Sequence, residues 1–277
     1  MMNSYKEMSL RDIQKVSLDI LKVFHDFCVS NNIRYSIGYG TLIGAVRHKG
    51  FIPWDDDVDV VMLREDYNKF INLFRDSENY KLFSGERRNM YGAIARLCEI
   101  KRTRVDLYVP LFSEATGVWI DIFPMDYIEE DHDRLLEDMQ SVISAHRETI
   151  MKRCLMRSMR NEVNGLRSLF HWIKMNVKYR NDIFSYVDAH LSKVNDISSE
   201  NGGLICQFGY PTYNERDVVI REAFDDVVEV NFEGSLFYAM KGYDLWLKNI
   251  YGDYMKLPPK EDRIAKHGQN KYYWISD

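Results

Sequence analysis

Cysteines are few in this sequence, and long apolar runs are absent from it. The four cysteines are spread over 277 residues and form no Cys-x-x-Cys pair, which argues against a zinc ribbon and leaves any disulfide framework sparse. We therefore expect reduced thiols, as in a cytoplasmic protein. No stretch approaches the roughly 18 apolar residues of a membrane-spanning helix, and no apolar segment follows the charges near the first residue. We expect neither a membrane span nor a signal peptide.

Internal repeats, low-complexity tracts and a strong excess of one charge are also lacking. The net charge of −5 and the isoelectric point near 5.9 argue against a chain that binds polyanions generically. Hydrophobic residues make up 45% and charged residues 29%, which excludes wholesale disorder and a fibrous repeat. A chain of this length can bury roughly three quarters of its unfolded surface, so it needs neither disulfides nor a metal to fold.

Helix and strand patterns alternate in the first half of the chain. Apolar residues recur at three- and four-residue spacing over 10–30, which predicts an amphipathic helix capped by Ser9. Further helices are expected at 42–47 and around Tyr67, Phe70 and Phe74. Strand patterns fall at 33–38, 57–63, 80–83, 93–100, 105–108 and 118–123. This order is typical of an α/β or α+β fold.

A basic helical segment follows the alternating half. Strand signals nearly vanish over 131–194, and 146–180 holds nine lysines or arginines against two acidic residues. Apolar residues between these cations suit a helix that lies on an anionic membrane surface. A solvated helical annex explains the pattern equally well, and RNA binding has no recognised signature here.

The remaining chain returns to mixed structure. Short strands are expected near 218–220 and 227–232, and a tyrosine-rich helix at 243–251. We divide the chain into a core (1–128), a basic helical insertion (129–200) and a C-terminal segment that packs back on the core (201–277).

The strongest chemical signal is the run Asp55-Asp56-Asp57-Val58-Asp59. Carboxylates this close repel one another, and residues two apart on a strand share one face about 6–7 Å apart. Asp57 and Asp59 could therefore share a divalent cation, with substrate phosphates as further ligands. A solvated acidic loop is the simplest alternative. An EF-hand is excluded, because Val60 stands where the calcium loop needs glycine.

Possible phosphate-binding groups precede the acidic run. Gly40-Thr41 forms a turn between a strand pattern and a short helix, where backbone N–H groups favour phosphate. Arg47, His48 and Lys49 supply cationic donors, although such a loop is usually only solvated. The combination with paired aspartates predicts a metal-dependent phosphoryl-transfer site.

A third carboxylate stands alone in an apolar strand. Asp121 lies in the run WIDIF at 119–123, and burial of an unpaired carboxylate costs several kcal/mol. It is either a third metal-binding acid or the partner of an arginine in a core salt bridge. Asp126 is the substitute candidate for the same role.

Three blocks of the chain resemble the LicD family of phosphotransferases. They are YSIGYGTLIGAVRHKGFIPWDDDVDVVMLREDY at 35–67, WIDIFPMD at 119–126 and YGDYMKLPPKEDR at 251–263. The resemblance implies a nucleotidyltransferase-like core with a mixed sheet, a helical insertion and a C-terminal clasp. It also implies that Gly40 and Thr41 meet nucleotide phosphates, with Asp57, Asp59 and Asp121 as catalytic and metal-binding acids.

The activity implied by this resemblance is transfer of a phospho-alcohol group, most simply phosphocholine. The expected donor is CDP-linked, such as CDP-choline, and the cofactor is Mg²⁺ or Mn²⁺. The expected acceptor is a lipopolysaccharide or teichoic acid precursor at the inner face of the plasma membrane, which 146–180 would contact. Related fukutin-like proteins transfer ribitol phosphate. Tyr39 and Trp54 flank the phosphate and metal elements, and are the first candidates to hold the head group.

Two alternatives remain open at this point. The first is a nucleotidyltransferase that attaches a nucleoside monophosphate to a small molecule or protein. The second is a non-catalytic membrane- or RNA-binding protein on the same fold. No nucleic acid is expected as a partner of the preferred enzyme.

Overall fold

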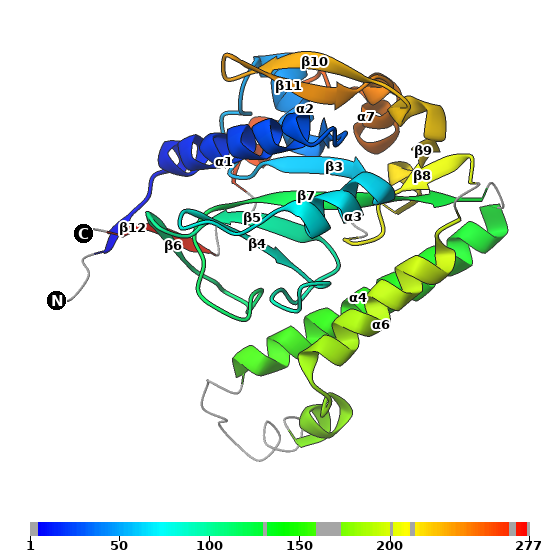
Figure 1. Cartoon of the computed structure of the whole chain (residues 1–277). Coiled ribbons are helices and arrows are strands. Elements are labelled where there is room, and N and C mark those ends of the chain that lie inside the picture. The colour runs from blue at the N-terminus through cyan, green and yellow to red at the C-terminus, as the bar shows by residue number, and fades with distance from the viewer. Residues whose placement is uncertain are drawn as a thin grey trace.

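A mixed sheet with helices packed around it forms the body of the protein (Figure 1). The computed structural model describes residues 5–129, 132–158, 173–199, 202–210, 214–265 and 270–275. The main sheet runs in the order β2-β3-β7-β5-β4, and β8 and β9 extend it from β7. Its strands are β2 (Ser36–Ile37), β3 (Asp59–Leu63), β4 (Tyr80–Ser84), β5 (Ala95–Glu99), β7 (Trp119–Ile128), β8 (Leu204–Cys206) and β9 (Val219–Ile220).

Strand direction in this sheet is mixed. β3 and β7 run parallel, whereas β2–β3, β4–β5, β5–β7, β7–β8 and β8–β9 are antiparallel. A mixed sheet with helices outside it belongs to the α+β class, so the predicted fold class is confirmed.

Helix α1 (Leu10–Ser30) packs on β5 and β7 through one apolar face. Its buried residues, among them Ile20 and Phe24, recur at helical spacing, as expected for a helix with one face on a core. The Ser9 hydroxyl accepts a hydrogen bond from the Asp12 N–H, and the Asp12 carboxylate accepts one from the Ser9 N–H. This reciprocal capping box fixes the start of the helix, and the predicted range and cap are confirmed.

Shorter helices complete the core. The ring of Phe70 in α3 (Arg64–Leu73) lies 5.0 Å from that of Phe24, so α3 packs against α1. Between β2 and β3 the chain forms α2 (Tyr39–Ile43), which continues directly as the π-helix η1 (Gly44–His48). The residues described later in the chain include the 3₁₀ turns η2 (Asn214–Asp217), η3 (Arg221–Phe224) and η4 (Lys260–Asp262).

The C-terminal part returns to the core at two places. β10 (Val227–Phe232) and β11 (Ser235–Met240) form a hairpin that contacts β2, and α7 (Tyr243–Tyr251) follows it. β12 (Lys271–Ile275) pairs with both β6 (Thr103–Asp106) and β1 (Tyr5–Glu7). The first and last described strands therefore share a small second sheet (Figure 1).

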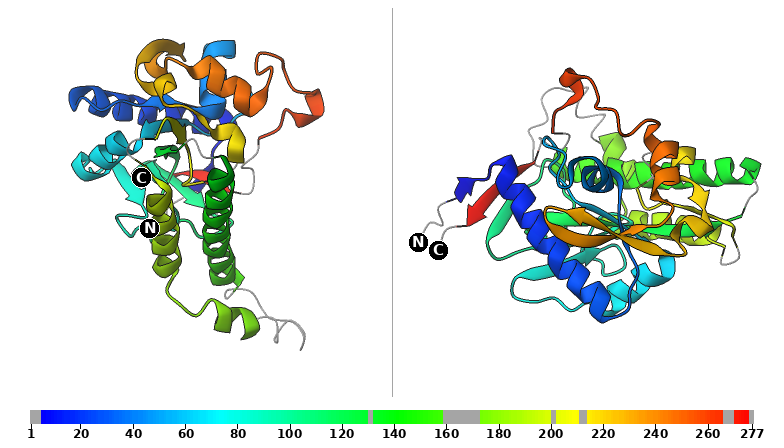
Figure 2. Two further views of the ribbon diagram at one scale, coloured as in Figure 1. Left: turned by 90° about the vertical axis from the view of Figure 1, so that its right-hand side faces the viewer. Right: turned by 90° about the horizontal axis from the view of Figure 1, so that it is seen from above.

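Helices α4 (His132–Ser158) and α6 (Ile183–Ile197) lie side by side and project from the sheet (Figure 2). The Thr149 hydroxyl of α4 donates to the Tyr186 carbonyl of α6. Val142 and Val194 are fully buried where the helices meet the end of β7. Among the described residues, no helix is long and apolar enough to cross a membrane.

Several predicted boundaries differ from the structure. The strand expected at 57–63 begins at Asp59, so Asp57 precedes the strand. β7 runs on to Ile128 instead of ending at 123, because its second half pairs with β8. Strands β1, β11 and β12 were not expected, since two of them pair with partners far away in the sequence.

Candidate active site

Strand register brings three charged residues into one row. Asp59 of β3 is paired with Asp121 of the parallel strand β7, and Asp121 is also paired with Arg96 of the antiparallel strand β5. Side chains that are directly opposite on neighbouring strands point to the same face of the sheet. The row Asp59–Asp121–Arg96 therefore crosses three adjacent strands on one face.

This row opens into a cavity of about 1200 Å³. Asp55, Asp56 and Asp57 line it from the loop before β3, and Arg153 and His146 line it from α4. The loop after α7 closes another side with residues such as Tyr254 and Pro258. All three predicted sections of the chain therefore meet at one cavity.

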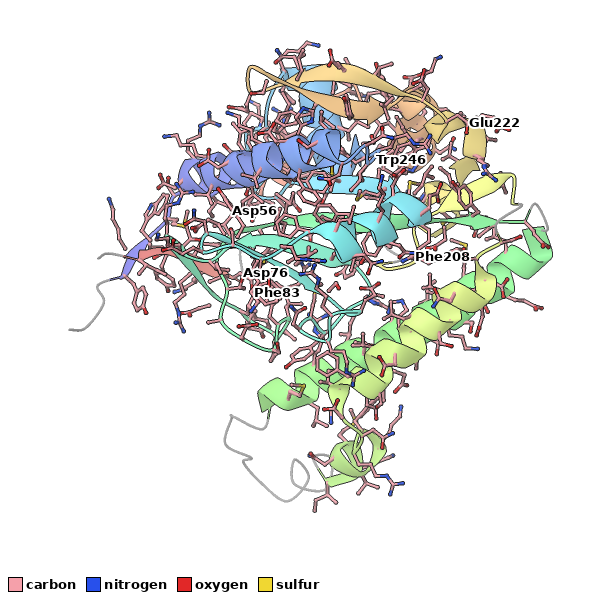
Figure 3. All side chains as sticks on the ribbon, in the orientation of Figure 1. Asp56, Asp76, Phe83, Phe208, Glu222 and Trp246 are labelled. Atoms are coloured by element: carbon pink, nitrogen blue, oxygen red, sulfur yellow. The ribbon has the colours of Figure 1, made fainter. Side chains whose placement is uncertain are left out.

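The acidic loop carries the group of carboxylates best placed to share an ion. Asp55, Asp56 and Asp57 each bring one oxygen within 4.8 Å of the others. Burial raises the pKa of the Tyr272 phenol in β12, and the charge of the nearby Asp56, labelled in Figure 3, raises it further. A donor set made only of carboxylate oxygens suits a hard cation such as Mg²⁺. The chemistry of this donor set suits the predicted divalent cation, but among the described residues only Asp57 of the predicted ligands Asp57, Asp59 and Asp121 belongs to the group. Metal binding stays a prediction, with Asp55 and Asp56 as additional candidates.

Asp59 lies where this loop joins the sheet. Burial raises its pKa well above the usual value, and the neighbouring carboxylates Asp57, Asp121 and Asp55 raise it further. The shift means that negative charge is poorly compensated at this point. A cation bound here would relieve that repulsion.

Asp121 is held by an arginine, which is the alternative that the sequence left open. The Arg96 Nε donates to Asp121 Oδ1, and the Trp119 Nε1 lies 3.4 Å from Oδ2. Within the described residues, Asp121 is not in the group whose oxygens all lie within 4.8 Å. It faces the cavity beside Asp59, and its metal-binding role stays a prediction.

Asp126, the substitute candidate, serves a different purpose. It lies five positions along β7, so its side chain points to the opposite face. Both of its oxygens accept hydrogen bonds from Arg64 of α3, at 2.6 and 2.8 Å. Asp126 is absent from the described cavity lining, and the bidentate pair identifies it as structural.

Gly40 and Thr41 were predicted to form a turn before a helix at 42–47, but they lie inside α2, which begins at Tyr39, and the helical stretch continues to His48. Both residues support the acidic elements of the site. A Cβ at Gly40 would meet Asp55 Oδ2 at 2.6 Å, so a larger residue here would displace that carboxylate. The Thr41 hydroxyl is buried and accepts a hydrogen bond from the Asp59 N–H at 2.9 Å. Gly40 lines the cavity and Thr41 does not. Their contact with nucleotide phosphates stays a prediction.

The three predicted cationic donors have different surroundings, although the Arg47 Nε donates to the His48 Nε2 at 3.0 Å. Arg47 lines the cavity, and its Nη1 donates to the carbonyls of Tyr254 and Lys256 at 2.6 and 3.2 Å. It thereby ties the loop after α7 to the core. His48 and Lys49 are not part of the described lining, and Lys49 ends η1 in a left-handed conformation. Phosphate binding by these residues likewise remains untested.

The aromatic candidates also differ from each other. The Tyr39 ring packs 4.8 Å from that of Trp246, and its hydroxyl donates to the buried Asp217 at 2.8 Å. Trp54 is half-buried in the cavity wall, with the Arg263 guanidinium 5.6 Å from its ring centre. Trp54 thus has the more accessible ring of the two.

Among the cavity residues that the sequence reasoning did not single out are two arginines. Arg96 lay in an expected strand, but nothing in its local pattern marked it as a partner of Asp121. Arg153 was counted only as one cation of the basic segment, whereas its neighbour Lys152 donates to the Tyr179 carbonyl and Arg147 is exposed. Arg160 and Arg167 of that segment lie outside the described residues.

A comparison with known proteins bears on this site. The family described as "LicD/FKTN/FKRP, nucleotidyltransferase domain" matches residues 32–163. The chain is 32% identical over 280 residues to the Haemophilus influenzae protein named "Lipopolysaccharide cholinephosphotransferase LicD", with 96% of this chain and 99% of that protein covered. The chain belongs to the LicD family.

The LicD resemblance predicted from the three sequence blocks is therefore confirmed, together with its class as a phosphotransferase. Two uncharacterized proteins from Rickettsia prowazekii and Rickettsia typhi share 51% identity over 47 residues. That match covers 17% of this chain and 18% and 15% of those proteins. In this LicD family member, the acidic loop, the Asp59–Asp121–Arg96 row and Arg153 surround one cavity.

Proposed function

We propose that the protein transfers phosphocholine from CDP-choline to a hydroxyl group of a lipopolysaccharide-type glycan, in a reaction that depends on Mg²⁺. The observation that carries the proposal is the pairing of Asp59 with Asp121 on adjacent parallel strands, beside the acidic loop 55–57. The near full-length similarity to a lipopolysaccharide cholinephosphotransferase supports the choice of alcohol and acceptor.

The residues of the cavity support direct displacement. Asp121 accepts the proton of the acceptor hydroxyl as that oxygen forms a bond to the phosphorus that carries choline. The bond from this phosphorus to the CMP oxygen breaks, and CMP leaves with both electrons. Arg96 fixes the orientation of Asp121, because its Nε donates to Oδ1.

A divalent metal fits the acidic end of the cavity. Asp55, Asp56, Asp57 and Asp59 would hold it, since they offer only carboxylate oxygens and crowd their charges together. When bound, Mg²⁺ neutralises charge on the diphosphate of the donor. Trp54 is the accessible aromatic face for the choline ammonium.

The test is a donor panel with the purified protein and a lipopolysaccharide acceptor. We expect CMP release from CDP-choline with Mg²⁺, and much less from CDP-ribitol and CDP-glycerol. Release of pyrophosphate from a nucleoside triphosphate would instead identify a nucleotidyltransferase. No turnover of any donor in the presence of Mg²⁺ or Mn²⁺ would overturn the proposed function.

Substitution of Asp59 tests the site itself. Asp59→Asn removes one charge from the crowded acids, and we expect a loss of at least about 100-fold in kcat with an unchanged melting temperature. Asp19→Asn, at an exposed position on α1, is the matched control and should retain full activity. Wild-type turnover by Asp59→Asn at saturating Mg²⁺ would remove Asp59 from the mechanism.

A further inference from the structure

Two arginines from distant parts of the chain meet at the cavity. Arg96 comes from β5 in the sheet, and Arg153 comes from α4 in the helical insertion. They are close enough for the charge of Arg96 to act on the Arg153 guanidinium. The cavity thus has a cationic wall as well as the acidic loop 55–57.

Arg96 is rigidly placed and has unused hydrogen-bonding capacity. Its Nε is engaged by Asp121, and its guanidinium lies 5.1 Å from the ring centre of Trp119 and 5.7 Å from that of Phe112. The side chain is 11% exposed, yet its buried Nη1 has no hydrogen-bond partner. A charged donor without a partner is costly in a protein interior, and its presence at a cavity wall is typical of a ligand-binding position.

Arg153 also has more N–H donors than the hydrogen bonds it makes to described residues. Its Nε donates to the neutral carbonyl of Pro110 at 2.8 Å. In the described parts of the chain, no carboxylate forms an ion pair with it. Burial and, to a smaller extent, the charge of Arg96 together lower the pKa of Arg153 to about 10. A purely structural arginine would be expected to face an acid, as Arg64 faces Asp126.

Among the described residues, the carboxylate that pairs with one of these two arginines is Asp121, and its partner is Arg96. Asp121 balances one positive charge, and it already accepts from Arg96. The acids of the loop 55–57 are grouped with one another and would be occupied by a metal ion. The two guanidinium groups therefore retain net positive charge at the cavity that they line, and the buried Nη1 of Arg96 has no hydrogen-bond partner.

We propose that Arg96 and Arg153 form an anion subsite that holds non-bridging oxygens of the donor diphosphate. Planar guanidinium groups match phosphate oxygens by paired hydrogen bonds, which favours this ligand over a carboxylate. The assignment of the anion as the donor diphosphate rests on the proposed function. It gives α4 a role in the site, because half of the subsite comes from the helical insertion.

The test measures binding of inorganic pyrophosphate by isothermal titration calorimetry, with EDTA and again with Mg²⁺. We expect Arg153→Gln to weaken binding by about 10-fold or more in both conditions. Arg147→Gln, an exposed position on the same helix, is the matched control and should bind as the wild type does. Arg153→Lys keeps the charge without the fork, and we expect an intermediate affinity.

Thermal unfolding of each variant shows whether α4 remains in place. If Arg153→Gln melts at the wild-type temperature and still binds pyrophosphate with wild-type affinity, the subsite is refuted. Absence of pyrophosphate binding by the wild-type protein also refutes it. If the wild type releases no CMP from CDP-choline but Arg153→Gln loses pyrophosphate affinity, the proposed function fails and the subsite stands.

Discussion

Strand β7 carries two buried aspartates on its opposite faces, and each has an arginine partner. Arg64 uses two nitrogens to occupy both oxygens of Asp126, which is fully buried between the sheet and α3. Arg96 contacts Asp121 through Nε alone and keeps a free Nη1 at a cavity wall. The Arg64–Asp126 pair thus uses two arginine nitrogens and both carboxylate oxygens. In the Arg96–Asp121 pair, one buried arginine nitrogen is left without a hydrogen-bond partner. A pair whose hydrogen-bonding groups are all used is a structural pair, whereas a pair with an unused donor at a cavity is a candidate ligand-binding site.

Substitution of Asp121 should affect turnover far more than stability. Asp121→Asn keeps the shape of the side chain but removes the proton acceptor, so we expect kcat to fall by about 100- to 10,000-fold. CMP release measures the loss, and circular dichroism melting should show an intact fold. If the Asp121→Asn protein is active, Asp121 is a structural residue like Asp126, and the two arginine–aspartate pairs do not differ in function.

Substitution of Arg64 should give the reverse result. Arg64→Met leaves the Asp126 carboxylate buried without a counter-charge, and we expect a loss of about 3–5 kcal/mol in the free energy of unfolding. Urea unfolding measures this loss. The double variant Arg64→Met with Asp126→Leu removes both charges and should recover most of the stability. Little destabilisation by Arg64→Met alone would contradict the structural assignment.

A third buried carboxylate, Asp217, is bound by neutral hydrogen-bond donors, and among the described residues it has no arginine partner. Asp217 accepts hydrogen bonds from the Tyr39 hydroxyl and the Trp246 Nε1, and burial raises its pKa to about 7. The unfolded carboxyl titrates near 3.8. Between about pH 4 and pH 7 the folded state therefore holds a proton that the unfolded state has lost. The contribution of Asp217 to stability must decrease as the pH rises through this window.

Asp217→Asn should remove that dependence, because the amide does not ionise. Relative to the wild type, we expect the variant to gain about 1–3 kcal/mol of unfolding free energy between pH 5 and pH 8. Urea unfolding of both proteins at the two pH values measures the difference. A constant difference across this range would show that hydrogen bonds from Tyr39 and Trp246 hold Asp217 ionised throughout.

Much of the fold was accessible from local patterns. The capping box at Ser9 and the apolar spacing of α1 lie within one segment, and the match of α7 to 243–251 has the same origin. Boundaries failed where pairing decided them, as at the end of β7, which continues because β8 lies beside it. β12 was missed because its partners β1 and β6 are more than 160 residues away in the sequence.

The residues of the candidate site also fall into those that the local sequence indicates and those that only the tertiary structure brings together. The run of acids at 55–59 and the lone Asp121 in an apolar strand are visible in the sequence because close or buried carboxylates are costly without a cation. Local sequence determined which acids to suspect. The register of β3, β7 and β5 decided that Asp59, Asp121 and Arg96 share a row, and the packing of α4 decided that Arg153 faces them. Such neighbours are chosen by long-range pairing and burial, which no local spacing encodes.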